Sequence, residues 1–344
     1  NSRKMSGIRK TIMMNRRSFS RQLSSFPLIS EEDRFKFDLE GFLVVKNVFT
    51  KNEIAAANKA VDIHENEMKE REGVLRNTKE GTSLAGDGKT GRMDMAGMLG
   101  WKSPDRDVFR SVLTHPKLIP YFHTILGEGY RLDHLPLLVS QRPGAEGFHL
   151  HGGPLEMNGK ANFNLTYTYL NHEIRTSLLG VAIQLTDVNK GQGGFCILKG
   201  SHKANFKVPE SIIHGEEEYL DLLYQPETKA GDVVFFSEAT THGSLAWNIN
   251  AKHNRRTAIF RFSPHNMAYS RSCYPSWPQE MYEDLTDAEQ AVLQPPYNMR
   301  LDRPYLTGYK DKEEDGKKSI EVGIQSRDKV KKLFDKEVFK NEFF

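Results

Sequence analysis

The chain has 344 residues, with 48 Lys and Arg against 45 Asp and Glu, which gives a formal net charge of +3. Its hydrophobic fraction of 38% and charged fraction of 27% are ordinary for a folded protein and exclude a largely disordered chain. No apolar run approaches the roughly 18 residues that a membrane-spanning helix requires. Two cysteines are too few for a disulfide framework or a cysteine-based zinc site, so we expect an intracellular protein in a reducing compartment.

Residues 1–34 differ in composition from the rest of the chain. The first 30 residues contain seven Lys or Arg and no acidic residue, and serines lie among the arginines. This composition is compatible with a mitochondrial or other organellar transit segment, and equally with a basic tail. Because the basic excess is confined to this segment, the sequence gives little support to nucleic-acid binding.

Helical and loop signals dominate the next part of the chain. Gly41–Val45 is typical of a short strand. Thr50 and Glu53 have the spacing of a capping box, which predicts a helix that continues to about Glu72. Residues 73–97 are rich in Gly, Thr and charge, and this composition predicts a long loop.

From Arg131 onward, short apolar runs alternate with turn residues. These runs are Leu135–Val139, Leu178–Leu185, Gly194–Leu198, Asp232–Phe236 and Ala258–Phe262. Many short strands between Gly, Pro and Asn turns predict a sandwich or barrel, mainly β with flanking helices. We place this domain at residues 35–310.

Residues 311–344 are expected to form a charged linker and a terminal amphipathic helix. Val330, Leu333, Phe334 and Val338 would lie on one face of that helix. Docking of this face on the domain is the simplest interpretation.

Three histidines have the context of a metal site. His149 and His151 are two residues apart at a predicted strand end, and strand geometry places such side chains on one face. His242 follows another apolar strand, far along the chain. Non-haem iron that activates oxygen uses three protein ligands on one face and leaves positions open for co-substrate. The pattern suggests such a site, with 2-oxoglutarate as the co-substrate.

A buried cation would have to bind the distal carboxylate of 2-oxoglutarate. Arg suits this role because its planar fork makes two parallel charge-assisted hydrogen bonds. Arg256 opens the strand after His242, and alternation along that strand predicts Arg256 inside the barrel and Arg255 outside. Arg261 shares the parity of Arg255 and is a weaker candidate. Ser244 is a plausible additional donor.

These segments together resemble the phytanoyl-CoA dioxygenase family over roughly residues 35–265. The matching segments are Gly41–Val45, Gln184–Val188, Gly193–Cys196, Lys199–His202, His242–Ser244 and Arg256–Ala258. The resemblance implies a double-stranded β-helix (jelly-roll, cupin-like) core that uses Fe(II), 2-oxoglutarate and O2. It implies that His242 is the distal ligand, that Arg256 is the co-substrate arginine, and that His202 belongs to the scaffold.

The proximal motif departs from the His-x-Asp of that family. If His149 is the first ligand, His151 replaces the aspartate and the site has three histidines. If His151 is the first ligand, Gly153 occupies the carboxylate position, as in halogenases of this type, where chloride fills the vacancy. A carboxylate from elsewhere could also fill the gap, with Glu156 and Glu238 as candidates by position.

The leading expectation is an oxygenase that hydroxylates a small organic or acyl substrate. The alternatives are an iron/2-oxoglutarate halogenase, a non-catalytic metal- or ligand-binding protein on the same scaffold, and a three-histidine oxygenase without 2-oxoglutarate. His151 and His242 are metal ligands under both alignments, whereas His149 is a ligand under only one. The sequence does not indicate the substrate or the oligomeric state.

Overall fold

The computed structural model describes residues 26–156, 158–273, 275–297, 303–314, 317–324 and 333–340. Most of the predicted tail at residues 1–34, and Val330 of the predicted terminal helix, lie outside these residues. No helix among the described residues is long and apolar enough to cross a membrane.

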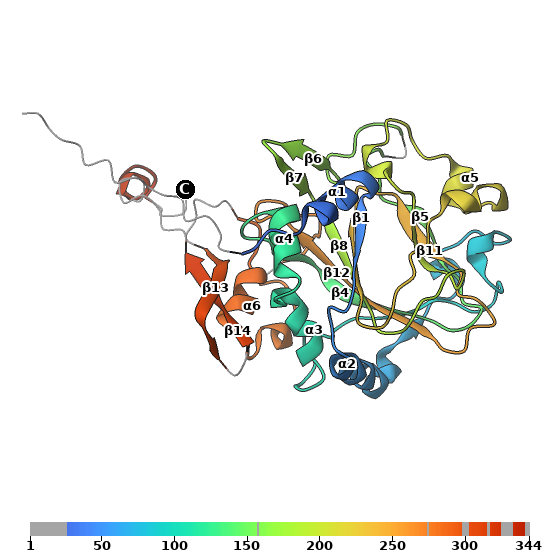
Figure 1. Cartoon of the computed structure of the whole chain (residues 1–344), viewed down its shortest axis with the longest axis horizontal. Helices are drawn as coiled ribbons and strands as arrows, with labels where there is room; N and C mark the ends of the chain where they lie inside the picture. The colour runs from blue at the N-terminus through green and yellow to red at the C-terminus, as the bar shows by residue number, and fades with distance from the viewer. Residues whose placement is uncertain are drawn as a thin grey trace, which may run out of the picture.

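Two antiparallel sheets face one another (Figure 1) and form the predicted jelly-roll core, which confirms the mainly β fold. The larger sheet has the order β1-β10-β8-β12-β4-β3-β2 and the smaller the order β5-β11-β9. The strands of the larger sheet are β1 (Phe42–Val45), β2 (Lys69–Glu70), β3 (Met93–Met95), β4 (Arg131–Gln141), β8 (Leu179–Gln184), β10 (Val233–Ser237) and β12 (Arg255–Ser263). Those of the smaller sheet are β5 (Phe148–His151), β9 (Gly194–Ile197) and β11 (His242–Leu245).

The helices are α1 (Glu31–Glu40), α2 (Lys51–Ile63), α3 (Asp107–Ser111), α4 (Ile119–Leu126), α5 (Glu210–Ile213) and α6 (Asp287–Val292). Helices including α3 and α4 cover the outer face of the larger sheet, and the smaller sheet lies across its inner face (Figure 1). Helix α5 instead packs beside β5 of the smaller sheet. Two hairpins complete the described chain, β6 (Tyr167–Leu170) with β7 (Glu173–Thr176), and β13 (Pro304–Glu314) with β14 (Lys317–Ile324).

The strands β8 and β10 of the larger sheet are buried along their whole length and are almost entirely apolar rather than alternating. Phe235 and Phe262 belong to the main core and contact Phe122 of α4. Phe236 points the other way, into a smaller apolar cluster between the two sheets that includes Val234. The space between the sheets is therefore only partly filled by apolar side chains, and the polar site lies beside this cluster.

Two boundary predictions were wrong. The capping box at Thr50 is present, but α2 ends at Ile63 instead of near Glu72. His64 caps the helix, and its ring stacks on Trp101 with 4.0 Å between centroids, which directs the chain away from the helix axis. The predicted linker after residue 310 is in fact the β13–β14 hairpin.

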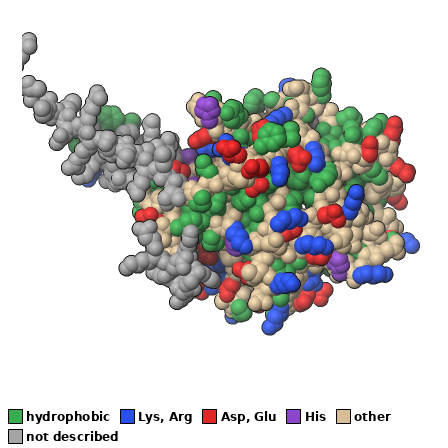
Figure 2. All heavy atoms as spheres, viewed as in Figure 1, with side chains coloured by type: hydrophobic (Ala, Val, Ile, Leu, Met, Phe, Trp, Pro, Cys, Tyr) green, Lys and Arg blue, Asp and Glu red, His purple; other side chains and the backbone are tan. Residues whose placement is uncertain are grey.

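Charged side chains of both signs are interspersed over the face shown in Figure 2. Ion pairs account for part of this mixing, for example Lys199 with Glu40 and Lys203 with Asp38. Such exposed pairs contribute little to stability individually.

Two histidines on the helical side predict a pH-dependent stability. Burial lowers the pKa of both His115 and His123 from 6.5 to about 4. The unfolded chain takes up these protons near pH 6.5, and the folded protein only near pH 4. Stability is therefore complete above pH 6.5 and decreases as the pH falls toward 4. From pH 7 to pH 5 each histidine should cost about 1–2 kcal/mol.

Thermal denaturation of the metal-free protein at the two pH values checks this expectation. The His123→Gln variant should lose part of the pH dependence. A melting temperature that rises between pH 7 and pH 5 would contradict the prediction.

Candidate metal centre

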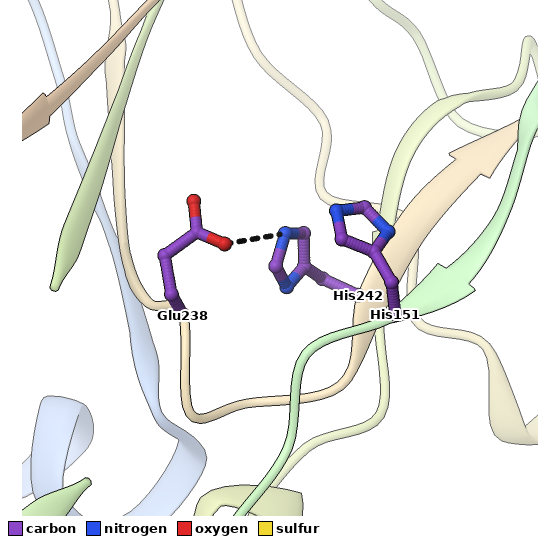
Figure 3. Close-up of side chains that lie close together, drawn as sticks. All are labelled: His151, Glu238 and His242. Carbon is purple, nitrogen blue, oxygen red and sulfur yellow. Dashed lines mark ion pairs between the residues drawn. The ribbon is translucent and has the colours of Figure 1, made fainter. Parts of the chain in front are cut away.

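His151 and His242 face each other across the smaller sheet. β5 and β11 pair antiparallel with these two residues in register, and their ring centroids are 4.3 Å apart. Each histidine lies at the end of its strand. The hydrogen bonds between the strands hold its backbone there, and no further strand residue covers its side chain. Residues that are about 90 positions apart in sequence thus form one pair of imidazoles (Figure 3).

Backbone carbonyls fix the orientation of both rings. Nδ1 of His242 donates to the Thr240 carbonyl oxygen at 2.7 Å, and Nδ1 of His151 donates to that of His149 at 3.2 Å. A carbonyl only accepts, so the proton of each neutral ring lies on Nδ1 and the lone pair on Nε2. Nε2 of His242 is buried and has no hydrogen-bond partner. Metal-binding histidines are usually oriented in this way.

Glu238 is the third member of the cluster. It follows β10 directly, and its Oε2 lies 3.4 Å from Nε2 of His242 (Figure 3). Its Oε1 accepts a hydrogen bond from Nε of Arg261 at 2.6 Å. Possible ligand atoms of His151, Glu238 and His242 lie within 4.8 Å of one another, the one such group found in the described part of the chain.

Burial and charge keep the cluster in a metal-binding protonation state. Burial, helped by the neighbouring His242, lowers the pKa of His151 to about 3, and burial also lowers that of His242. Burial alone would raise the pKa of Glu238, but the charge and hydrogen bond of Arg261 together with the neighbouring His242 and His151 outweigh burial and lower the value to about 2. At neutral pH the site therefore has two neutral imidazoles and one carboxylate.

The structure does not bring His149 into this cluster. Its Nδ1 donates to the carbonyl oxygen of Asn77 at 2.6 Å, and its ring stacks on Phe148. The pairing of β5 with β11 is irregular, because Ser244 is opposite Phe148 although His242 is opposite His151. A bulge of this kind changes the direction of the side chain inside it. The simple i, i+2 rule therefore fails at His149.

Arg255 lies in a cavity of about 350 Å³ that reaches the two histidines. The cavity is lined by residues that include Arg92, His151, His242, Ser244, Arg255 and Arg261. Arg255 is only 3% exposed. Its Nη1 donates to Oε1 of Gln141 at 2.8 Å, and its Nε has no hydrogen-bond partner. No carboxylate of the described residues forms an ion pair with it. Burial and the nearby Arg92 lower its pKa to about 10, so it remains charged.

The predicted orientation of Arg256 was wrong. Its side chain points away from the cavity, where Nη2 pairs with Asp62 at 2.7 Å and Nη1 donates to Asn58. Side chains do alternate along β12 as predicted, but the face assigned to each arginine was the wrong one. Ala258 and Phe260 lie on the same side of the strand as Arg256, and they pack in the core under the helices. The outer face of this sheet is the more apolar one. That apolar series was the available sequence signal for placing Arg255 inside.

Ser244 was predicted as a co-substrate donor, and it does line this cavity. Its Oγ is within 3.5 Å of Oε1 of Gln141, the same atom that binds Arg255. Gln141 therefore links Ser244, a predicted co-substrate donor, to Arg255, which had been predicted to point outward.

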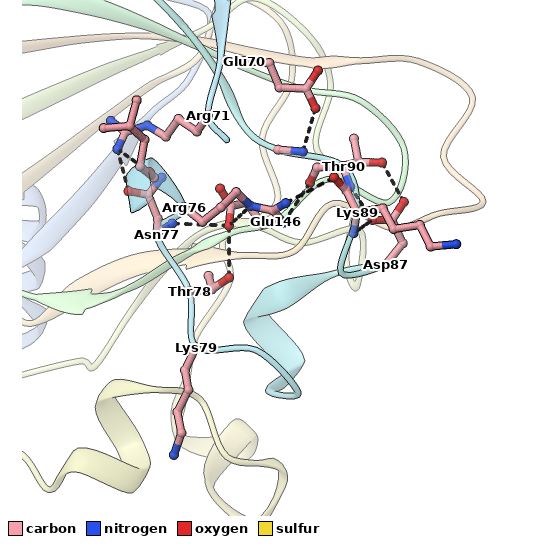
Figure 4. Close-up of polar contacts among 12 residues, drawn as sticks. Glu70, Arg71, Arg76, Asn77, Thr78, Lys79, Asp87, Lys89, Thr90 and Glu146 are labelled. Carbon is pink, nitrogen blue, oxygen red and sulfur yellow. Dashed lines mark hydrogen bonds and ion pairs between the residues drawn. The ribbon is translucent and has the colours of Figure 1, made fainter. Parts of the chain in front are cut away.

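The predicted loop at residues 73–97 was partly wrong, because Met93–Met95 form β3. Its residues 73–92 form a strap along this cavity, which Arg76, Asn77 and Arg92 line, and Figure 4 shows polar contacts of the strap. The buried Glu146 anchors it: the carboxylate pairs with Nε of Arg76 at 2.8 Å and accepts from Thr78 at 3.1 Å. Arg71 binds Asp94 and donates to the side chain of Asn77. Arg71 and Arg76 thus have carboxylate partners, unlike Arg255. Sequence reasoning did not identify their position at the cavity.

A second cavity, of about 400 Å³, opens on the other side of the histidines. Its walls include Leu155, Leu165, Val208, Ile213 and Tyr269 together with His151 and Glu238. Exposed Phe206 stands at this cavity. The two cavities meet at the metal cluster, one cationic and one more apolar.

Comparisons with known proteins show the family of the chain. The sequence profile described as Phytanoyl-CoA dioxygenase (PhyH) matches residues 37–257. The chain belongs to the phytanoyl-CoA dioxygenase family. Members of this family are oxygenases that use Fe(II), 2-oxoglutarate and O2, which confirms the enzyme class and the cofactors expected from the sequence. No curated protein matches the chain in a sequence comparison.

Solved structures of HygX from Streptomyces hygroscopicus have a similar fold. The form with nickel and 2-oxoglutarate bound has a TM-score of 0.55 at 19% identity, covering 71% of this chain and 90% of that chain. The form that also contains hygromycin B has a TM-score of 0.54 at 19% identity, with the same coverage. The iron-bound form has a TM-score of 0.54 at 21% identity, again with 71% and 90% coverage. At this identity the likeness concerns the fold.

The donor set fits the metal of the phytanoyl-CoA dioxygenase family. Two imidazole nitrogens and a carboxylate on one face are the ligands that non-haem iron prefers, and the orphaned Nε2 of His242 is explained by a bound ion.

The family's carboxylate position is Gly153 in the alignment that begins at His151. Gly153 has φ +105°, and an added Cβ would lie 3.0 Å from Oγ1 of Thr241. We therefore expect Gly153→Asp to destabilise the protein by about 1–3 kcal/mol, measured by chemical denaturation. Gly159→Asp is the matched control, because Gly159 has φ +78° in open space and Asp tolerates that region. Equal losses in the two variants would contradict the prediction.

Proposed function

We propose that this member of the phytanoyl-CoA dioxygenase family is a hydroxylase of a small organic or acyl substrate. The observation that carries the proposal is Arg255, a buried guanidinium without a carboxylate partner among the described residues, in the cavity of His151 and His242. A buried unpaired charge is costly. A dicarboxylate that binds Arg255 would remove this cost and present its other end to the histidines.

The residues around the cluster have separate roles in this proposal. Bound iron, with 2-oxoglutarate and O2, supplies the oxidising chemistry at the substrate carbon. His151 and His242 would hold the ion through Nε2. Arg255 and Ser244 would bind the distal carboxylate of the co-substrate, and Gln141 would fix the orientation of both.

The second cavity is the proposed substrate site. Its volume of about 400 Å³ is in the range of small-molecule pockets, and its walls are mainly apolar. The presence of hygromycin B in a HygX structure supports a small organic substrate on this fold. Substrate carbon held there would lie beside His151 and Glu238, on the side opposite to Arg255.

Halogenation is the second candidate, because Gly153 provides no carboxylate. Without a side chain at residue 153, a halide could take the place that the aspartate has in the family. Hydroxylation and halogenation then differ only in whether another carboxylate reaches the metal.

Succinate formation tests the proposal. Purified protein with Fe(II), 2-oxoglutarate and ascorbate should release succinate, with and without chloride, and His242→Ala should abolish the release. Failure of the wild-type protein to bind 2-oxoglutarate at millimolar concentration in the presence of Ni(II), measured by calorimetry, would reject the proposal.

A further inference from the structure

Glu238 is held next to the position that Gly153 leaves without a carboxylate. The backbone N–H of Gly153 donates to the carbonyl oxygen of Glu238 at 3.2 Å, so the two backbones are in contact. Gly152 also lies against Glu238, since a Cβ added to Gly152 would be 2.5 Å from the carbonyl oxygen of Glu238. A side chain at residue 238 can therefore reach the metal from a neighbouring segment.

Arg261 fixes the carboxylate of Glu238. It lies on β12, in the middle of the larger sheet, and its Nε binds Oε1 of Glu238 at 2.6 Å. The backbone N–H of Glu238 donates to the Leu178 carbonyl oxygen at 3.0 Å, which fixes the other end of the residue. With Oε1 occupied, only Oε2 faces His242, at 3.4 Å. The cis ligands of one small ion are about this far apart, given metal–ligand distances of about 2.1 Å.

We propose that Glu238 is the third protein ligand, in place of residue 153, and that Arg261 is a positioning residue that limits it to one coordinating oxygen. The inference rests on the proposed function, because the metal is the one that the oxygenase requires. Glu238 bound in this way fills the position that a halide would need. Hydroxylation is then the expected reaction.

Cobalt(II) in chloride-free buffer is a suitable probe of the ligand set. Its affinity, measured by calorimetry, and its visible absorption spectrum, with and without chloride, are compared among variants. Glu238→Gln removes the ligand with little change of shape, and Arg261→Gln removes the positioning charge. Arg261→Lys is the conservative variant, Glu156→Gln controls for loss of an exposed glutamate, and His242→Ala reports on the site as a whole.

We expect Glu238→Gln to weaken cobalt binding by at least about ten-fold and to make the spectrum sensitive to chloride. Arg261→Gln should also weaken binding by about ten-fold, while Arg261→Lys and Glu156→Gln stay within about three-fold of wild type. In Glu238→Gln alone, Arg261 loses its carboxylate partner, which could prevent folding. The double variant Glu238→Gln/Arg261→Gln removes both charges of the pair, and it should show the same sensitivity of the cobalt spectrum to chloride.

Two results would overturn the proposal: unchanged affinity in Glu238→Gln and the double variant, or a wild-type spectrum that responds to chloride as strongly as these variants. Failure of the proposed function has a different signature, because wild type and His242→Ala would then bind cobalt equally weakly. Loss of binding in His242→Ala with none in Glu238→Gln rejects only the inference about Glu238.

Discussion

Arg255→Gln is expected to weaken 2-oxoglutarate binding by at least about 100-fold, because truncation of a buried, hydrogen-bonded charge pair costs roughly 2–5 kcal/mol. The glutamine can still hydrogen-bond to Gln141, so the loss reports the missing guanidinium. Titration of the Ni(II)-loaded protein with 2-oxoglutarate in a calorimeter measures the effect.

Arg256→Gln is the matched control for this experiment. The two arginines are adjacent in sequence, yet Arg256 pairs with Asp62 outside the cavity. Its substitution should leave 2-oxoglutarate affinity within about two-fold of wild type, since exposed ion pairs contribute little. The reverse outcome, a large loss in Arg256→Gln and a small one in Arg255→Gln, would mean that the co-substrate does not occupy the cavity of Arg255.

His151→Ala should lose at least about 100-fold in metal affinity, whereas His149→Ala should stay within about three-fold of wild type. The reason is that Nε2 of His151 lies with His242 and Glu238, while His149 is hydrogen-bonded to the strap at Asn77. Competition of each variant with a chromogenic chelator for Co(II) gives the affinities.

Melting curves of the two metal-free variants provide the control for folding. Loss of the His149 hydrogen bond to Asn77 should lower the melting temperature slightly without changing metal affinity. Equal affinity losses in both variants would favour the three-histidine site and would contradict the assignment of Glu238.

The family and the general location of the site could be predicted from local sequence. The apolar runs around β8, β10 and β12 give strands because each is short and bounded by turn residues, and these strands are present. His242 was recognisable because it follows β10 after a short turn. His151 was common to both alignments of the proximal motif, and it lies opposite His242.

Other parts of the site depend on contacts between segments that are distant in sequence. The choice between Arg255 and Arg256 depends on which face of β12 the helices cover, and helix packing decides that. His149 leaves the cluster because β5 and β11 pair irregularly. The strap reaches the cavity through Glu146, which is buried and far from it in sequence.

The sequence by itself determined a mainly β fold, because short apolar runs between turn residues are a local property. Its resemblance to the phytanoyl-CoA dioxygenase family implied the jelly-roll oxygenase, and it predicted His151 and His242 at one site. It left open which group replaces the missing aspartate. Only the tertiary structure places Glu238 beside His242 and Arg261 beside Glu238, and it does so through strand register and sheet packing. A carboxylate can be moved from one segment to another while the geometry around the metal is kept, because coordination depends on the position of an oxygen atom in space rather than on its place in the chain.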